Sequence, residues 1–291
     1  MADTSFILWV RQFAQPWLTN VFLGITALGS VEYYMVALPI VYWLINKRFG
    51  IRFAAFFAFS AYINSALKYL FAVPRPPEEL RLTVQEGYSF PSGHAQGSTT
   101  FWGFLALHLR KGWAWAGAAV LIALISFSRI YLGVHYPIDI LVGIAVGALL
   151  LGGYQVVQAR IPQNMPLKTW FWGGLAAALA LYLIHPTGDG PVTVGFMLGA
   201  LLGYAVEVGT VDFSPKGTLT QNALKLLLGI AGLFGLRFLL KPITNQLPGT
   251  TGDLLRYTIL GFWTACGAPL LFVGLGLAKS EKHTLTAPPA A

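Results

Sequence analysis

The sequence predicts an all-α protein, a polytopic transmembrane helical bundle of about nine spans with interfacial helices at its N-terminus. Three observations lead to this fold class. Hydrophobic residues make up 56% of the chain and charged residues only 10%, which lies outside the composition of soluble domains. Several apolar runs approach the ~20 residues that a helix needs to cross a bilayer. The few polar clusters lie between these runs, and an apolar span favours a helix because a helix satisfies its own backbone hydrogen bonds.

The N-terminal segment, residues 1–29, is expected to form helices that lie along the membrane interface. Arg11, Pro16 and Asn20 interrupt its Phe, Leu and Trp residues, and a break into two helices is expected at Pro16. No basic region or cleavage site precedes the apolar residues, which argues against a removable signal peptide. The alternative is a true span, which the cost of Arg11 in mid-bilayer disfavours.

Nine membrane spans are expected after this segment. Their ranges are 31–47, 50–73, 93–109, 113–131, 137–159, 169–185, 190–209, 222–240 and 254–278. Residues 30–160 hold all the motifs described below, so they are expected to form the catalytic core. Residues 161–291 are expected to add further transmembrane helices. Glycines at 195, 199 and 203 form a small-residue stripe that favours close helix packing within one chain, with a homodimer as the alternative.

Basic residues in alternate loops predict the orientation of the chain in the membrane. Most fall on one side of the nine-span layout: Lys47, Arg48, Arg52, Arg110, Lys111, Arg160, Lys168, Lys216, Lys279 and Lys282. That side should be cytoplasmic, which explains the net charge of +8 better than nucleic-acid binding does. Arg237, Lys241 and Arg256 depart from the trend. Glu207, near the cytoplasmic end of its span, is expected to pair with Lys225.

Three polar clusters interrupt the apolar sequence, each near a predicted helix end. They are Lys68-x6-Arg75-Pro76, Pro91-Ser92-Gly93-His94 and Ser128-Arg129-x5-His135-x3-Asp139. Each cluster alone has an ordinary explanation: His-x3-Asp is usually a helix-surface pair, Pro-Ser-Gly a turn, and a lone lysine a snorkelling side chain. Three such clusters in order are much harder to explain structurally. Charged groups in apolar surroundings point to a functional site.

The residue types in these clusters suit a bound phosphate. Lys68, Arg75 and Arg129 supply positive charge, and a phosphoryl group carries its negative charge on non-bridging oxygens. The prolines around Arg75 are expected to end its helix and to place this arginine in an exposed loop. Pro91 is expected to open a helix whose first backbone N–H groups, at Ser92 and Gly93, bind the anion.

The two histidines then take different roles. Asp139 lies four residues after His135, so the carboxylate can hold one ring nitrogen protonated and aim the other at phosphorus. His135 is therefore the expected nucleophile and Asp139 the residue that orients it. His94, at a helix start beside the phosphate, is the expected general acid for the leaving oxygen. No metal or other cofactor is expected, because the grouped carboxylates of a magnesium or calcium site are missing from the sequence.

The three clusters together resemble the type-2 phosphatidic acid phosphatase superfamily. The chain matches every specified position of that pattern, from Lys68 to Asp139, and the likeness covers roughly residues 30–160. It implies a metal-independent phosphatase that acts on phosphorylated membrane lipids, with the same roles for the two histidines. The additional C-terminal spans resemble, more loosely, the layout of glucose-6-phosphatase and sphingosine-1-phosphate phosphatase.

Two other functions and several substrates stay open at this point. A lipid phosphotransferase could use the same phosphohistidine with an acceptor other than water. A transporter is disfavoured because the polar clusters lie at helix ends rather than in broken mid-membrane helices. The substrate candidates are a polyprenyl pyrophosphate, phosphatidylglycerol phosphate, phosphatidic acid and a sphingoid phosphate. The loop charges place the site on the extracytoplasmic face, as in the periplasm outside a bacterial inner membrane.

Overall fold

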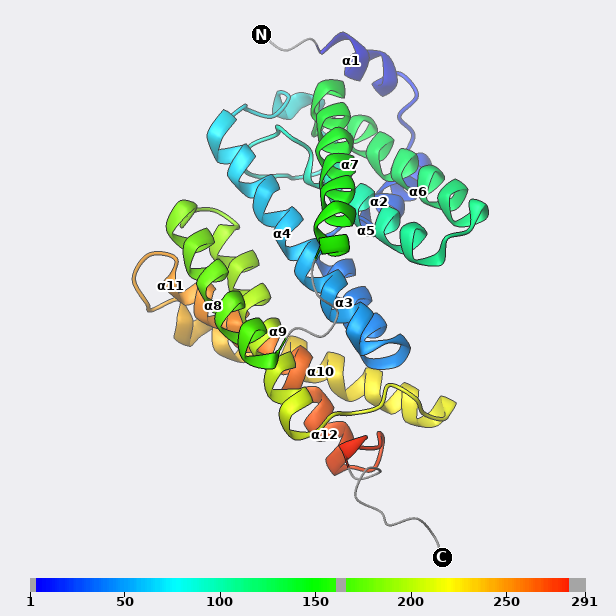
Figure 1. Cartoon of the computed structure of the whole chain (residues 1–291). Helices are drawn as coiled ribbons and strands as arrows, with labels where there is room; N and C mark the ends of the chain where they lie inside the picture. Colours follow the sequence, from blue (N-terminus) through cyan, green and yellow to red (C-terminus); the bar gives the residue numbers. More distant parts are fainter. Residues whose placement is uncertain (1–3, 161–165, 283–291) are drawn as a thin grey trace, which may run out of the picture. The chain divides into compact units, whose positions relative to one another are not determined.

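The computed structural model describes residues 4–160 and 166–282, and all the secondary-structure elements named in these residues are helices (Figure 1). The first helices are α1 (Ser5–Arg11), α2 (Pro16–Ala27), α3 (Val31–Ile40) with the π-turn η1 (Val41–Ile45), and α4 (Lys47–Phe71). After the 3₁₀ turn η2 (Glu78–Leu80) come α5 (Gly93–Leu109), α6 (Gly112–Tyr131) and α7 (Pro137–Arg160). The last are α8 (Leu167–Ile184), α9 (Gly190–Thr210), α10 (Leu219–Thr244), α11 (Thr251–Phe262), the π-turn η3 (Trp263–Gly267) and α12 (Ala268–Gly274).

The described helices confirm an all-α membrane protein but not the count of nine spans. Each expected range is helical, yet six helices are long and apolar enough to cross a membrane, namely α4, α6, α7, α9, α10 and the continuous α11–α12. α2 and α3–η1 pass the test only together, bent by 46°, and would make a seventh if they form one span. α5 has 17 residues, and the apolar part of α8 covers Phe171–Ile184. These helices fall short of the ~20 residues of a typical span.

The N-terminal helices begin and end where proline predicts. α1 ends at Arg11, and α2 begins with Pro16 as its first residue, so the expected break is confirmed. Ile7 and Val10 of α1 are buried in a cluster with Ile130, Val134 and their neighbours, while the other face of α1 exposes aromatic side chains. The pairing of α2 with α3 keeps a broken span as the alternative to an interfacial helix.

The chain separates into two compact units. The first contains residues 1–34 and 60–161, and the second contains residues 35–59 and 162–291. In the first unit, α5 packs against both α6 and α7. Glycines make the α5–α7 contact close: a Cβ at Gly143 would lie 2.8 Å from the carbonyl oxygen of Ser92, and one at Gly147 would lie 2.8 Å from Cβ of Thr99. This contact joins the start of α5 to the start of α7, where the second and third clusters lie.

In the second unit, α9 packs tightly against α11 through the predicted glycine stripe. A Cβ at Gly195 or Gly199 would collide with the α11 backbone at Leu254 or Thr258. The interpretation of this stripe as packing within one chain is therefore confirmed. α10 also uses a glycine for close packing, because the Trp43 ring lies against Gly229. Nε1 of Trp43 donates to the carbonyl oxygen of Thr264 at 2.8 Å.

The expected pairing of Glu207 with Lys225 is wrong. The Nζ of Lys47 lies 3.5 Å from Oε1 of Glu207 and 2.5 Å from Oδ1 of Asp212. Lys225 instead donates to the carbonyl oxygen of Pro215 at 2.8 Å. The turn after α9 explains the difference, because it folds back so that the backbone N–H of Phe213 also donates to Glu207.

Candidate active site

The first cluster spans the end of α4 and the loop after it. α4 ends at Phe71, before Pro74, and carries Lys68 in its last turn. Arg75 lies in the loop, as the prolines predict, but the expectation that it would be exposed is wrong, since only 9% of its surface is accessible. The loop folds over the arginine because Nε of Arg75 donates to the carbonyl oxygens of Glu86 at 3.1 Å and Gly87 at 3.0 Å.

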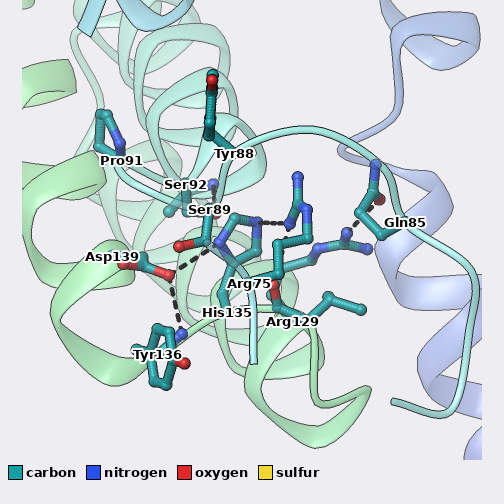
Figure 2. A network of polar contacts seen from close by, with 12 residues as sticks. Arg75, Gln85, Tyr88, Ser89, Pro91, Ser92, Arg129, His135, Tyr136 and Asp139 are labelled. Atoms are coloured by element: carbon teal, nitrogen blue, oxygen red, sulfur yellow. Dashed lines mark hydrogen bonds and ion pairs between the residues drawn. The ribbon is translucent and has the colours of Figure 1, made fainter. Parts of the chain in front are cut away.

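Arg75 also joins the first cluster to the third. Its Nη1 donates to the carbonyl oxygen of Val134 at 2.9 Å and lies 3.2 Å from Nε2 of His135 (Figure 2). Burial lowers the pKa of Arg75 to about 10, with a further lowering from Arg81 and an opposing effect from Asp139. The guanidinium therefore remains positive at neutral pH beside the imidazole.

His135 and Asp139 form the expected pair. Nδ1 of His135 lies 3.2 Å from Oδ2 of Asp139, and the same oxygen accepts the backbone N–H of Tyr136 at 2.9 Å. Both side chains are buried. A guanidinium only donates, so Nε2 of His135 is the acceptor of the Arg75 contact and the ring proton belongs on Nδ1, toward Asp139. This tautomer leaves the lone pair of Nε2 at the end of the ring away from the carboxylate.

Burial and neighbouring charge keep His135 neutral. Its pKa lies well below the usual 6.5, first because the ring is buried and then because Arg75 and the other cations of the site repel a proton. The pair lies across the start of α7 rather than along the helix, since α7 begins at Pro137. The preceding turn depends on Gly133, whose φ is +69° and where a Cβ would collide with the carbonyl oxygen of Leu80.

The second cluster forms the N-terminus of α5, with one correction to the expected anion site. Pro91 lies outside the helix, and Ser92 is the N-cap, its hydroxyl accepting the N–H of Ala95 at 3.4 Å. The backbone N–H of Ser92 is not free for an anion, because it donates to the carbonyl oxygen of Asp139 at 3.0 Å. Helical geometry leaves the N–H groups of Gly93 and His94 without intrahelical acceptors. These two groups, rather than those of Ser92 and Gly93, remain for an anion.

Asn64 of α4 holds this turn from the other side. Its Nδ2 donates to the carbonyl oxygen of Pro91 at 3.3 Å and to Oε1 of Gln96 at 2.9 Å. A Cβ at Gly93 would lie 3.0 Å from Oδ1 of Asn64, so the absence of a side chain permits this close approach. The start of α5 is thus fixed to α4 through Asn64 and to α7 through Asp139.

The other two cations face the same loop as Arg75. Nζ of Lys68 donates to the carbonyl oxygen of Tyr88 at 2.7 Å. Nη2 of Arg129 donates to Oε1 of Gln85 at 2.7 Å (Figure 2). Arg129 is only 2% exposed, and its Nε is buried without an acceptor among the described residues. The acceptors in these contacts are neutral: backbone carbonyls, the Gln85 amide and the His135 ring nitrogen. Such contacts orient positive charge without cancelling it.

All eight residues predicted for the site lie in the first unit, and the contacts above connect most of them directly. Asn64 satisfies a neighbouring helix, one of the two roles that its place just before Lys68 allows. Sequence reasoning missed Gln85 and Thr26, which contact Arg129. No motif or helical period marks these residues, because their role depends on contacts between segments far apart in the chain. A polar residue next to a motif, such as Asn64 before Lys68, is the signal that the sequence offered.

Comparison with known proteins gives two family matches. Residues 49–162 match the model of the PAP2 superfamily, and residues 191–280 match the model described as "PAP2 superfamily phosphatase, transmembrane extension". Lipid phosphate phosphatase delta of Arabidopsis thaliana is 26% identical over 77% of this chain and 62% of its own length. Phosphatidylglycerophosphatase B of Bacillus subtilis is 32% identical over 47% of this chain and 73% of its own length.

A solved structure is also similar. The crystal structure of the first transmembrane PAP2 type phosphatidylglycerolphosphate phosphatase from Bacillus subtilis has a TM-score of 0.49 and 27% sequence identity, covering 56% of this chain and 87% of that one. The present chain spans less than two thirds of the length of the plant relative.

Proposed function

Because this chain belongs to the PAP2 superfamily, we propose that it hydrolyses the phosphate or pyrophosphate ester of a membrane lipid through a phosphohistidine at His135, without a metal ion. The observation that carries the proposal is the line of contacts from Asp139 through the His135 ring to Arg75, with separations of 3.2 Å on each side of the ring. This arrangement fixes the tautomer of a nucleophilic imidazole and places a cation at its free nitrogen.

In the first step, Nε2 of His135 attacks phosphorus and the bond from phosphorus to the lipid oxygen breaks. The entering phosphate takes the place of Arg75 Nη1 at Nε2 and receives hydrogen bonds from Arg75, Lys68 and Arg129 in exchange. The N–H groups of Gly93 and His94 hold another of its oxygens. Burial and the three cations lower the pKa of His94 in the free site, so we assign its second ring proton to the bound state, in which the negative phosphate offsets those cations. His94 transfers this proton to the leaving oxygen, which releases a lipid alcohol from a monoester or a lipid monophosphate from a pyrophosphate.

In the second step, water attacks the phosphorus of the phosphohistidine. His94, now neutral, accepts a proton from that water, and the bond from phosphorus to Nε2 breaks to release inorganic phosphate. His135 returns to its neutral form with its Nδ1 proton still directed at Asp139. The three cations stabilise the charge of both transition states, which is the contribution that a metal ion makes in other phosphatases.

The substrate class follows from the membrane setting of the site and from the relatives. Exposed apolar side chains at the end of α4, among them Leu70 and Phe71, stand beside Lys68 where the lipid tail would lie. The relatives are named for lipid phosphate and phosphatidylglycerophosphate. We therefore propose a lipid phosphate or pyrophosphate, with polyprenyl pyrophosphate, phosphatidylglycerol phosphate, phosphatidic acid and sphingoid phosphate as the compounds to compare.

Phosphate release from these four lipids, in detergent with excess EDTA and without an acceptor lipid, tests the proposal. Wild-type protein should release phosphate from at least one of them. His135→Ala should abolish both turnover and the trapped phosphoenzyme. His94→Ala should still form phosphoenzyme from a substrate with a good leaving group, because only the general acid is lost. Normal turnover of His135→Ala, or activity that depends on added magnesium, would contradict the mechanism. Turnover only with an acceptor lipid would identify a phosphotransferase.

We also propose that the site faces the extracytoplasmic side, as in the periplasm of a bacterial cell, with residues 30–160 as the catalytic core and 161–291 as an added membrane part. The support is the loop charge: Arg110 and Lys111 follow α5, whose 17 residues put them about 25 Å from the start of that helix. A cysteine at Glu79 on a Cys266→Ala background should react with an impermeant thiol reagent in intact cells, and one at Lys111 only after lysis. The reverse labelling would place the site in the cytoplasm.

A further inference from the structure

Arg129 is held from two sides by residues that belong to none of the three motifs. Its Nη1 donates to Oγ1 of Thr26 at 2.8 Å, and its Nη2 donates to Oε1 of Gln85 at 2.7 Å. Thr26 comes from α2, 103 residues before the arginine, and Gln85 comes from the loop between α4 and α5. These contacts fix the plane of the guanidinium.

The turn after α2 also packs against the site. A Cβ at Gly29, just after α2, would lie 2.9 Å from Cδ2 of His94 and 2.7 Å from Cγ2 of Ile125. The helix is also attached to the end of α6 that carries Arg129. Oγ1 of Thr19 lies 3.2 Å from the hydroxyl of Tyr131, and the Phe22 and Tyr131 rings are 4.2 Å apart. This segment lies outside residues 49–162, which match the PAP2 model.

We propose that Thr26 and Gln85 are positioning residues that hold the Arg129 guanidinium ready for phosphate, so that the N-terminal helix α2 is part of the active site. An arginine recognises phosphate through a planar fork of N–H groups, and its long side chain loses much rotamer freedom when the fork is fixed. Neutral acceptors at Nη1 and Nη2 fix the guanidinium before phosphate binds, and they leave its positive charge uncompensated. The inference rests on the proposed phosphate-binding role of Arg129.

The opposite interpretation makes an opposite prediction. If the Gln85 oxygen instead occupies the place of a phosphate oxygen, then its removal should strengthen anion binding, because a competitor is lost. If Gln85 positions Arg129, its removal should weaken anion binding. The two interpretations therefore predict opposite changes in anion affinity when the Gln85 oxygen is removed. We expect weaker binding.

The test compares Thr26→Val and Gln85→Met, which keep side-chain size but remove the acceptor, with two matched controls. Thr19→Val makes the same change on the same helix, where the hydroxyl contacts Tyr131 instead of Arg129. Val84→Met changes the neighbour of Gln85, whose side chain is 90% exposed. Orthovanadate binding is measured directly by calorimetry, and kcat, KM and Tm are measured for each variant on the lipid that the wild type hydrolyses.

Each positioning variant should weaken vanadate binding and lower kcat/KM by roughly 10-fold, since a hydrogen bond that orders a charged group contributes on that scale. Val84→Met should match the wild type, and Thr19→Val, which weakens only the attachment of α2 to Tyr131, should lower binding less than Thr26→Val does. Thr26→Ser should restore binding, and Thr26→Val should add nothing in an Arg129→Met background. Unchanged or tighter vanadate binding in both variants, with Tm unaltered, would overturn the inference. A wild type that binds vanadate but releases no phosphate would instead contradict the proposed function. The comparison of vanadate binding would still test the positioning role of Thr26 and Gln85.

Discussion

Two of the buried clusters that contain lysine or arginine differ in the groups that contact the positive charge. In the second unit, Lys47 contacts the carboxylates of both Glu207 and Asp212. In the first unit, Lys68, Arg75 and Arg129 contact neutral oxygens, while Asp139 is engaged with His135. A cation paired with carboxylates has its partner within the fold. Cations whose hydrogen bonds go to neutral groups retain more of their attraction for an anion from outside, which is what a phosphate-binding site needs.

The largest expected effect on activity comes from removing an uncompensated cation. Arg75→Gln should lower kcat/KM by roughly 10²–10³-fold, because the guanidinium stabilises transition-state charge next to the nucleophile. The free energy of unfolding should change much less than activity does. Kinetics and thermal unfolding of the purified variant check both points, with Arg110→Gln at an exposed helix end as the control. A large loss of stability with normal specific activity would make Arg75 a structural residue.

The matching change in the second unit should affect stability instead. Lys47→Met removes the partner of the fully buried Glu207, and breaking a buried ion pair costs about 3–5 kcal/mol. Activity per folded molecule should stay near that of the wild type. Thermal unfolding in detergent measures the loss, and the double variant Lys47→Met, Glu207→Gln should recover part of it, since no unpaired charge remains. A loss of kcat in folded Lys47→Met would show that this cluster is coupled to catalysis.

A smaller effect is expected in the pH dependence. Burial and the cations of the site lower the pKa of His135 below 6.5, so the nucleophile stays neutral until the pH falls below that value. The acid limb of kcat/KM should therefore lie below pH 6.5. In Arg75→Gln the acid limb of the residual activity should lie at a higher pH than in the wild type, because one of the charges that lowers the pKa of His135 is gone. Because both proteins are assayed with the same substrate, ionisation of the substrate affects the two pH profiles equally. An unshifted limb would assign it to another group.

The predictions about local structure succeeded where a few neighbouring residues decide the outcome. Pro16 and Pro137 start helices, and α4 ends before Pro74, because proline lacks the N–H that a helix interior needs. The pairing of His135 with Asp139 also follows from short spacing. The predictions that failed needed knowledge of distant segments: the burial of Arg75, the use of the Ser92 N–H by Asp139, and the partner of Glu207.

The amino-acid sequence by itself determined that this protein is a helical membrane protein, and it placed at helix ends the residues that we propose bind phosphate. Composition, apolar run length and proline position act locally, and the spacing of the motifs carries the chemistry. Only the tertiary structure decided which groups meet each cation, because those partners are backbone carbonyls and uncharged side chains from loops and helices far along the chain. Any residue offers a carbonyl oxygen, so no pattern of residue types reveals which ones will face Lys68, Arg75 and Arg129. The fold selects them when it brings α2, the loop after α4 and the start of α7 to the same place in the first unit.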